Sequence, residues 1–160
     1  MESLEIYTDG ACSGNHVIGI PRRAGIGIVM VDEEEIMWEY GMEVTEKIAP
    51  DITNNRAELY AVFYALRTFA DECEGYDSVI VHTDSKYVVD IFNIWLEGWR
   101  KSGKDYKNRD LIDAVDTLLK ELRRKYIISI HHVRGHSTNK YNNMADKLSV
   151  DAITSSSYIN

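Results

Sequence analysis

The chain has 160 residues, of which 44% are hydrophobic and 28% are charged, and its formal net charge is −8 at pH 7. This composition is that of an ordinary globular protein and fits one domain over residues 1–160 with a single core. No apolar run comes near the roughly 20 residues that span a bilayer, so we expect no membrane partner.

The first half of the chain predicts three strands and then a helix. The strands are expected over residues 3–8, 24–31 and 36–43, the first ending at the turn signal Asp9-Gly10. Residues 13–23 would form a loop and 32–35 a hairpin tip. Residues 55–70 change to helical spacing, with an apolar stripe at Leu59, Val62, Phe63, Leu66 and Phe69.

The second half alternates strands and helices. A short buried strand is expected over 77–83 and a β-branched strand over 126–133. Helical spacing predicts helices over about 85–97, 111–122 and 143–153, the last after a polar loop at 134–142. The order βββ-α-β-α-α-β-α predicts an α/β fold with helices packed on a mixed sheet.

Charge is unevenly distributed along the chain. Residues 1–77 carry 16 acidic and 5 basic side chains, whereas residues 78–160 carry 10 and 13. Half of the 18 Lys and Arg residues lie between Arg100 and Lys125. Such a run is typical of a solvated helix face, and it also permits phosphate binding.

The two cysteines, Cys12 and Cys73, suit neither a disulfide framework nor a metal cluster. The N-terminus also lacks the basic and apolar regions of a signal peptide. We therefore expect an intracellular protein, and the cytoplasm is the simplest location.

Four carboxylates stand out, although each has an ordinary explanation. Asp9 would be a turn residue, and Glu58 would close a capping box with Asn55. Asp84 would cap the following helix, and Asp146 would lie on a solvated helix face.

These explanations leave open whether the four carboxylates meet at one rim of the sheet, where ligands of open α/β sheets gather. Converged carboxylates repel one another unless cations neutralise them. Their hard oxygen ligands suit Mg²⁺ or Mn²⁺ better than Zn²⁺. Two such ions in a carboxylate cluster are a common arrangement for phosphodiester cleavage.

Longer motifs surround these acids. They are Tyr-Thr-Asp-Gly at 7–10, Thr-Asn-Asn-Arg-Ala-Glu-Leu at 53–59, Thr-Asp-Ser-Lys-Tyr-Val at 83–88, and Gly135-His136 followed by Asp146. In this order, and over about residues 4–153, they resemble the motifs of type 1 ribonuclease H (ribonuclease HI). The resemblance implies the ribonuclease H-like fold, a five-stranded mixed sheet flanked by helices. It leaves no room for a separate hybrid-binding domain.

The resemblance also implies an activity: an endonuclease that hydrolyses the RNA strand of RNA–DNA hybrids and leaves 5′-phosphate and 3′-hydroxyl ends. Asp9 would bridge two Mg²⁺ ions, for which Mn²⁺ could substitute. Asp146 would help hold the ion that generates the attacking hydroxide. Glu58 and Asp84 would hold the ion at the leaving 3′-oxygen. His136 would help to move protons or release product, and the alternative is a surface-loop histidine.

Hybrid contacts follow from the same resemblance. Asn54 and Asn55 would reach the minor groove, and Thr53 would bind a DNA phosphate. Trp95 and Trp99 would begin the DNA-strand channel, continued by Arg100 and Lys101. Asn142 would steady the loop or the metal shell. The alternatives are helix capping for residues 53–55 and core packing for one tryptophan.

Three departures concern the grip on the substrate. The basic handle after Trp99, which consists of Arg100, Lys101, Lys104, Lys107 and Arg109, is shorter than in long-handled members of the family. The loop at 15–23 is longer than usual. Lys86 and Asp51 also replace residue types common in the family.

A non-catalytic hybrid-binding module on this fold is the alternative function, and a DNA-cutting resolvase or integrase core is a third. The expected partner is an RNA–DNA hybrid, bound by a monomer without a small-molecule cofactor.

Overall fold

The computed structural model describes residues 2–13, 22–45, 52–135 and 138–156. Its elements in chain order are β1 (Ser3–Ser13), β2 (Arg23–Asp32), β3 (Glu35–Val44), α1 (Asn54–Glu72), β4 (Ser78–Thr83), α2 (Lys86–Asp90), the π-helical turn η1 (Ile91–Trp95), α3 (Leu96–Ser102), α4 (Arg109–Leu122), β5 (Ile127–His132) and α5 (Lys140–Ser156). None of the described helices is both long and apolar enough to cross a membrane.

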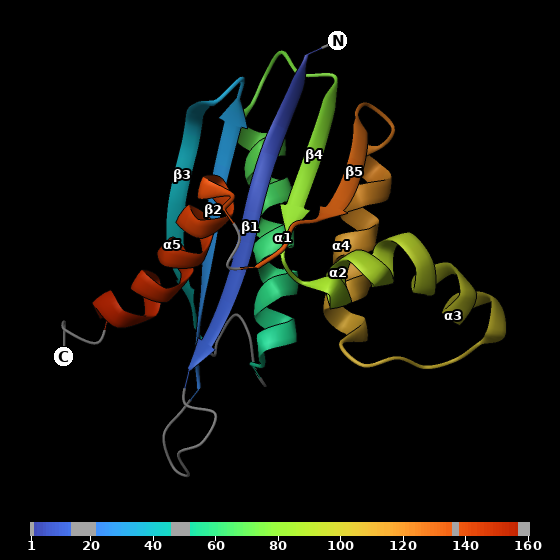
Figure 1. Ribbon diagram of the computed structural model, residues 1–160. Coiled ribbons are helices and arrows are strands. Elements are labelled where there is room, and N and C mark those ends of the chain that lie inside the picture. Colours follow the sequence, from blue (N-terminus) through green and yellow to red (C-terminus); the bar gives the residue numbers. More distant parts are fainter. Residues whose placement is uncertain (1, 14–21, 46–51, 136–137, 157–160) are drawn as a thin grey trace.

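The strands form one five-stranded sheet in the order β3-β2-β1-β4-β5. β1 pairs antiparallel with β2, and β2 with β3, whereas β1, β4 and β5 run parallel. Figure 1 shows α1 and α4 behind the sheet and α5 in front of it. The predicted mixed sheet with helices packed on it is therefore confirmed.

The predicted apolar stripe of α1 forms the centre of the core. Leu59, Val62, Leu66 and Phe69 are fully buried between α1 and the sheet, and Phe63 is partly buried. Each such side chain contributes roughly 1.5–3 kcal/mol when it leaves water. This packing fixes the start of α1, and with it Glu58, against the middle of β1.

Helix α5 lies on the other face in direct contact with the strands. A Cβ added at Gly25 would lie 2.2 Å from the carbonyl oxygen of Ser149, and one at Gly27 would lie 2.0 Å from that of Ala145. On β3, a Cβ at Gly41 would lie 2.6 Å from the carbonyl oxygen of Leu148. These three glycines therefore let the backbone of α5 rest on the sheet, where it carries Asp146.

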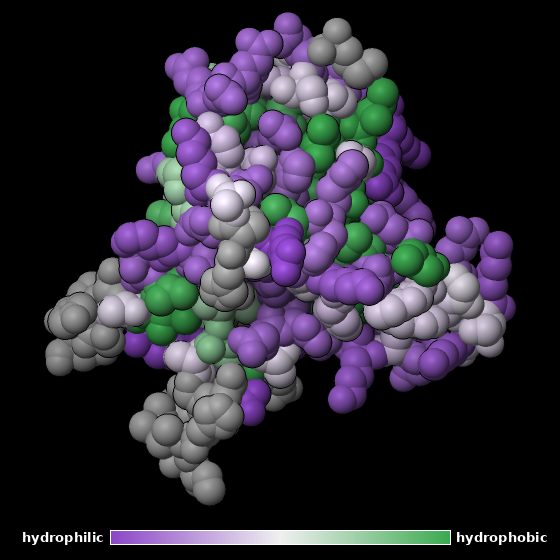
Figure 2. Space-filling view, viewed as in Figure 1, coloured by the Kyte–Doolittle hydropathy of each residue, from purple (hydrophilic) through white to green (hydrophobic). Residues whose placement is uncertain are grey.

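The segment between β4 and α4, residues 86–108, is called the arm. Residues 86–102 of the arm form one continuous helical run with a π-helical turn, which is longer than the predicted helix 85–97, and residues 103–108 are a non-helical connection to α4. Figure 1 shows it projecting from the side of the molecule beyond β4 and β5. The face in Figure 2 is mostly hydrophilic, and the arm carries the exposed hydrophobic residues Ile94 and Trp95.

Candidate active site

Asp9 lies inside β1, so the turn predicted at Asp9-Gly10 is wrong. β1 pairs with β2 as far as Ser13, whereas its pairing with β4 stops at Thr8 opposite Thr83. Asp9 is therefore the first residue of β1 beyond the end of β4. Asp84 follows Thr83 directly, so the two aspartates meet at the same rim of the sheet.

Gly10 brings β1 and α1 into backbone contact. A Cβ at Gly10 would lie 2.4 Å from the carbonyl carbon of Ala57 and 2.5 Å from the nitrogen of Glu58. At this contact the Gly10 N–H donates a hydrogen bond to Oε1 of Glu58 at 2.5 Å. The absence of a side chain at Gly10 thus allows β1 and α1 to approach closely, and the Gly10 N–H orients the carboxylate of Glu58.

Glu58 and Asp84 do not have the capping roles predicted for them. The cap of α1 is Thr53, whose hydroxyl accepts from the Arg56 N–H at 3.1 Å. The cap of α2 is Ser85, whose hydroxyl accepts from the Val88 N–H at 3.2 Å. Because neighbouring side chains cap both helices, the two carboxylates are available to the site.

The carboxylates of Asp9, Glu58 and Asp84 converge. One oxygen from each lies within 4.8 Å of the others, an arrangement that could hold a metal ion. Asp146, half-buried on α5, lies within hydrogen-bonding reach of Asp9. The four predicted carboxylates, taken from three different layers of the fold, therefore meet at one place.

The electrostatics of the cluster are those of crowded negative charge. Burial, the charge of Asp84 and a hydrogen bond with Asp146 raise the pKa of Asp9 to about 8. Burial and the charges of Asp9 and Asp84 also raise the pKa of Glu58 well above its ordinary value. The donor atoms are all carboxylate oxygens, which fit a hard divalent cation such as Mg²⁺ or Mn²⁺.

Two residues that support the site were missed from the sequence. Ser149 is fully buried, and its hydroxyl lies 3.1 Å from Oδ2 of Asp9 and 2.7 Å from the carbonyl oxygen of Asp146. Arg56 is buried and binds both carboxylate oxygens of Asp110, at 2.9 and 2.8 Å, which ties the start of α1 to α4. Helical spacing is the signal for Ser149, because residues three apart share a helix face.

The predicted hybrid-contacting residues lie near the rim or on the arm. Asn54 and Asn55 are exposed in the first turn of α1, one turn before Glu58. On the arm, Trp95 is 39% exposed, whereas Trp99 is partly buried against the core. The two rings lie 5.7 Å apart, and Trp99 stacks on Tyr106 at 5.2 Å.

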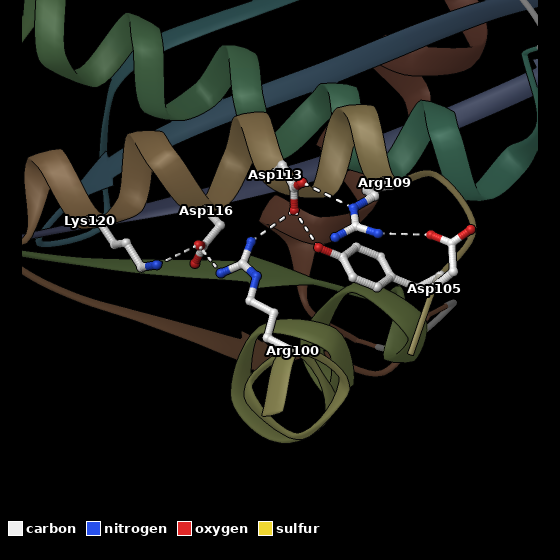
Figure 3. A network of polar contacts seen from close by, with 7 residues as sticks. Arg100, Asp105, Arg109, Asp113, Asp116 and Lys120 are labelled. Atoms are coloured by element: carbon white, nitrogen blue, oxygen red, sulfur yellow. Dashed lines mark hydrogen bonds and ion pairs between the residues drawn. The ribbon is translucent and has the colours of Figure 1, made fainter. Parts of the chain in front are cut away.

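Two basic residues of the arm, Arg100 and Lys101, form ion pairs with acids, and Figure 3 shows those of Arg100. The guanidinium of Arg100 binds Asp113 at 2.8 Å and Asp116 at 2.6 Å, both on α4. Asp113 also accepts a hydrogen bond from the Tyr106 hydroxyl at 2.5 Å. Lys101 pairs with Glu97 at 3.1 Å, but both side chains are well exposed, so its charge faces solvent.

Asn142 and His136 are the remaining predicted residues. Asn142 is 1% exposed, and its backbone N–H donates to Oδ1 of Asn139 at 3.0 Å in the first turn of α5. Its burial suits support of the neighbouring loop better than contact with a ligand. His136 lies outside the described residues.

Comparisons with known proteins find relatives that cover most of this chain. The profile of the RNase H family matches residues 1–154. A ribonuclease H of Chelativorans is 39% identical over 157 residues, which cover 92% of this chain and 83% of that protein. The crystal structure of RNase H1 from Halobacterium salinarum has a TM-score of 0.68 at 28% identity, over 96% of this chain and 98% of that one. LC11-RNase H1, solved in complex with an RNA/DNA hybrid, has a TM-score of 0.66 at 25% identity over the same shares.

Proposed function

The chain belongs to the ribonuclease H family, and from that premise we propose that it is an endonuclease that hydrolyses the RNA strand of RNA–DNA hybrids. The observation that carries the proposal is the convergence of Asp9, Glu58 and Asp84 within 4.8 Å, beside Asp146. A cluster of this charge is costly for a protein that merely binds nucleic acid, because uncompensated carboxylates repel phosphates.

We propose that the four carboxylates hold two divalent cations, Mg²⁺ or Mn²⁺. Asp9, at the centre of the cluster, would contact both. Divalent ions bound there supply activation of the attacking water and charge stabilisation at the attacking and leaving oxygens. Cleavage of the bond between phosphorus and the 3′-oxygen would leave 5′-phosphate and 3′-hydroxyl ends.

The protein's own contribution is orientation. The Gly10 N–H holds one oxygen of Glu58, and the buried Ser149 hydroxyl contacts Asp9. The sheet and α1 fix three carboxylates, and α5 brings the fourth. Held in this way, the carboxylates need little rearrangement to receive cations. His136 would move a proton to or from the reacting groups.

The hybrid would lie across the rim and the arm. Thr53, Asn54 and Asn55 at the start of α1 would contact both strands next to the cut, where the RNA strand is distinguished by its 2′-hydroxyls. Trp95 and Trp99 would give the DNA strand an apolar surface, and Lys101 would meet its phosphates. Asn142 would support the segment between β5 and α5. The exposed Lys104 and Lys107 extend the basic surface along the arm.

Arg100 differs from its neighbours because its charge is already shared by two aspartates. The sequence predicts a direct contact with the hybrid, whereas these ion pairs favour an indirect role in holding α3 against α4. We also propose that the enzyme acts as a monomer in the cytoplasm and that it needs no small-molecule cofactor.

A cleavage assay tests the proposal. A hybrid with a labelled RNA strand should be cut in Mg²⁺ and left intact in EDTA, and the same sequence as a DNA duplex should remain intact. Asp84→Asn should abolish cutting without unfolding the protein, because it removes a ligand charge and keeps the shape. Hybrid binding without turnover in Mg²⁺ or Mn²⁺ would favour the non-catalytic module instead, and cutting of the DNA duplex would favour a DNA nuclease.

A further inference from the structure

A buried hydroxyl links two of the four carboxylate residues. Ser149 on α5 has no exposed surface, and its Oγ lies 3.1 Å from Oδ2 of Asp9 on β1. The same Oγ lies 2.7 Å from the backbone carbonyl oxygen of Asp146, three residues earlier on its own helix. The Ser149 Oγ therefore contacts both Asp9 and Asp146, the first and the last of the four carboxylate residues in sequence order.

Close packing against β2 fixes the backbone of Ser149. A Cβ at Gly25 would lie 2.2 Å from the Ser149 carbonyl oxygen, and one at Gly27 would lie 2.9 Å from its nitrogen. The backbone of Ser149 thus sits directly on β2, the strand that pairs with β1 at Asp9. The backbone of Ser149 cannot shift without moving the helix, and the hydroxyl is held by its contacts with Asp9 and the Asp146 carbonyl oxygen.

The Ser149 hydroxyl has one hydrogen, so it donates to one of its two neighbouring oxygens at a time or shares that hydrogen between them. Serine in a helix commonly bonds to a carbonyl oxygen one turn earlier, and the contact with Asp146 is of that kind. The contact with Asp9 is different, because it joins two separate elements across the floor of the site. A carboxylate held by a hydroxyl loses rotational freedom and keeps its remaining lone pairs for other ligands.

We propose that Ser149 is a positioning residue that orients Asp9 toward Asp146 and so sets the affinity of the site for divalent cations. The inference rests on the proposed function, in which these two residues hold a cation. Hydrogen bonds to ligating carboxylates are typical determinants of metal affinity, and their loss usually costs 10- to 100-fold in affinity or activity.

The test is Ser149→Ala, which removes the hydroxyl and keeps the helix and the volume of the β-carbon. Mn²⁺ is titrated by calorimetry into the metal-free protein without nucleic acid, and the Mg²⁺ concentration for half-maximal cleavage is measured separately. We expect Mn²⁺ affinity to fall about 10-fold or more and the half-maximal Mg²⁺ concentration to rise in parallel. Hybrid affinity in EDTA should change less than about twofold.

Thr68→Val is the matched control. It removes a hydroxyl hydrogen bond, 2.8 Å to Tyr40, that also joins a helix to a strand. Thr68 lies ten residues beyond Glu58 on α1, about 15 Å along the helix, so its loss should leave Mn²⁺ affinity unchanged. Equal Mn²⁺ affinity for wild type and Ser149→Ala would overturn the proposal. An equal loss in Thr68→Val would do the same, because it would make the effect a general one of stability.

A second variant keeps the test decisive if the alanine protein does not fold. Ser149→Cys retains a weak donor of similar shape and should give an intermediate Mn²⁺ affinity, whereas wild-type affinity there would contradict the proposal. The wild-type measurements separately decide the proposed function: a wild type that cuts no hybrid fails as a ribonuclease. A wild type that cuts while Ser149→Ala retains full metal affinity refutes the role of Ser149 alone.

Discussion

Asp84 adds negative charge to the carboxylate cluster, and repulsion within this cluster lowers the stability of the metal-free protein. The charge of Asp84 is the second cause, after burial, of the raised pKa of Asp9. Asp84→Asn should therefore stabilise the metal-free protein by about 1–3 kcal/mol, since each pKa unit corresponds to about 1.4 kcal/mol. The same change should abolish cleavage.

Urea unfolding in EDTA measures this gain, and the control is Asp71→Asn, an exposed position near the end of α1. A stabilisation of equal size at Asp71 would assign the effect to net charge. A loss of stability in Asp84→Asn would show that the carboxylate is structurally required.

Gly10 offers a test of backbone contact. In Gly10→Ala the new Cβ would meet backbone atoms of Ala57 and Glu58, at 2.4 and 2.5 Å, and backbone cannot move aside as a side chain can. We expect a destabilisation of about 1–3 kcal/mol and strongly reduced cleavage, because the shift of α1 carries Glu58 away from its amide donor.

The control is Gly98→Ala on α3, where a Cβ would meet nothing within 4 Å. There the alanine should be neutral or stabilising by up to about 1 kcal/mol, because it favours the helix. Thermal unfolding and the cleavage rate are measured for both variants. If both lose stability alike, crowding at Gly10 is not the cause.

At the scale of elements, the order of strands and helices along the chain follows from hydrophobic periodicity, whereas the five-stranded sheet and the four-carboxylate set could be predicted from the resemblance of the motifs. The ends of elements could not be predicted. β1 continues through Asp9-Gly10 because β2 pairs with it there, which is tertiary information. Similarly, Thr53 and Ser85 cap their helices in place of Asn55 and Asp84, since several polar residues in a row compete for one cap.

The arm carries both paired and exposed basic residues: Arg100 and Lys101 form ion pairs, whereas Lys104 and Lys107 are exposed. Arg100 is held by Asp113 and Asp116 (Figure 3), so its removal should loosen the arm without removing a phosphate contact. In an Asp84→Asn background, where cleavage is blocked, Arg100→Gln should weaken hybrid binding about fivefold, or about 1 kcal/mol. The slope of log affinity against log salt should not change.

Lys107→Gln, at an exposed position of the arm, should instead reduce that slope by about 0.9 if it neutralises one phosphate. Asp113→Asn distinguishes the indirect role of Arg100 from a direct phosphate contact. It should weaken binding, as Arg100→Gln does, because it releases the same contact. Stronger binding in Asp113→Asn would show that the freed Arg100 meets a phosphate directly.

For the molecule as a whole, the crowded carboxylates make stability depend on pH and on metal. The pKa of Asp9 rises from an ordinary 3.8 to about 8, so between these values the folded state holds a proton that the unfolded state has lost. The free energy of unfolding in EDTA should therefore fall as pH rises from 5 to 8. Mg²⁺ should restore it at pH 8, because it binds the folded state.

His82 acts in the opposite direction, since burial lowers its pKa and favours the folded state as pH rises. The contribution of Asp9 is therefore the difference between wild type and Asp9→Asn, each followed by urea unfolding at several pH values. A difference that does not change with pH would place the pKa of Asp9 near its ordinary value.

The glycines beneath α5 have a consequence for the order in which the site is completed during synthesis. Asp9, Glu58 and Asp84 belong to β1, α1 and the end of β4, all of which precede β5 in the chain. Asp146 comes with α5, which emerges from the ribosome later and must then settle onto Gly25, Gly27 and Gly41. A growing chain would thus possess three carboxylates before it has the fourth, and its ability to cut would begin only when the last helix docks.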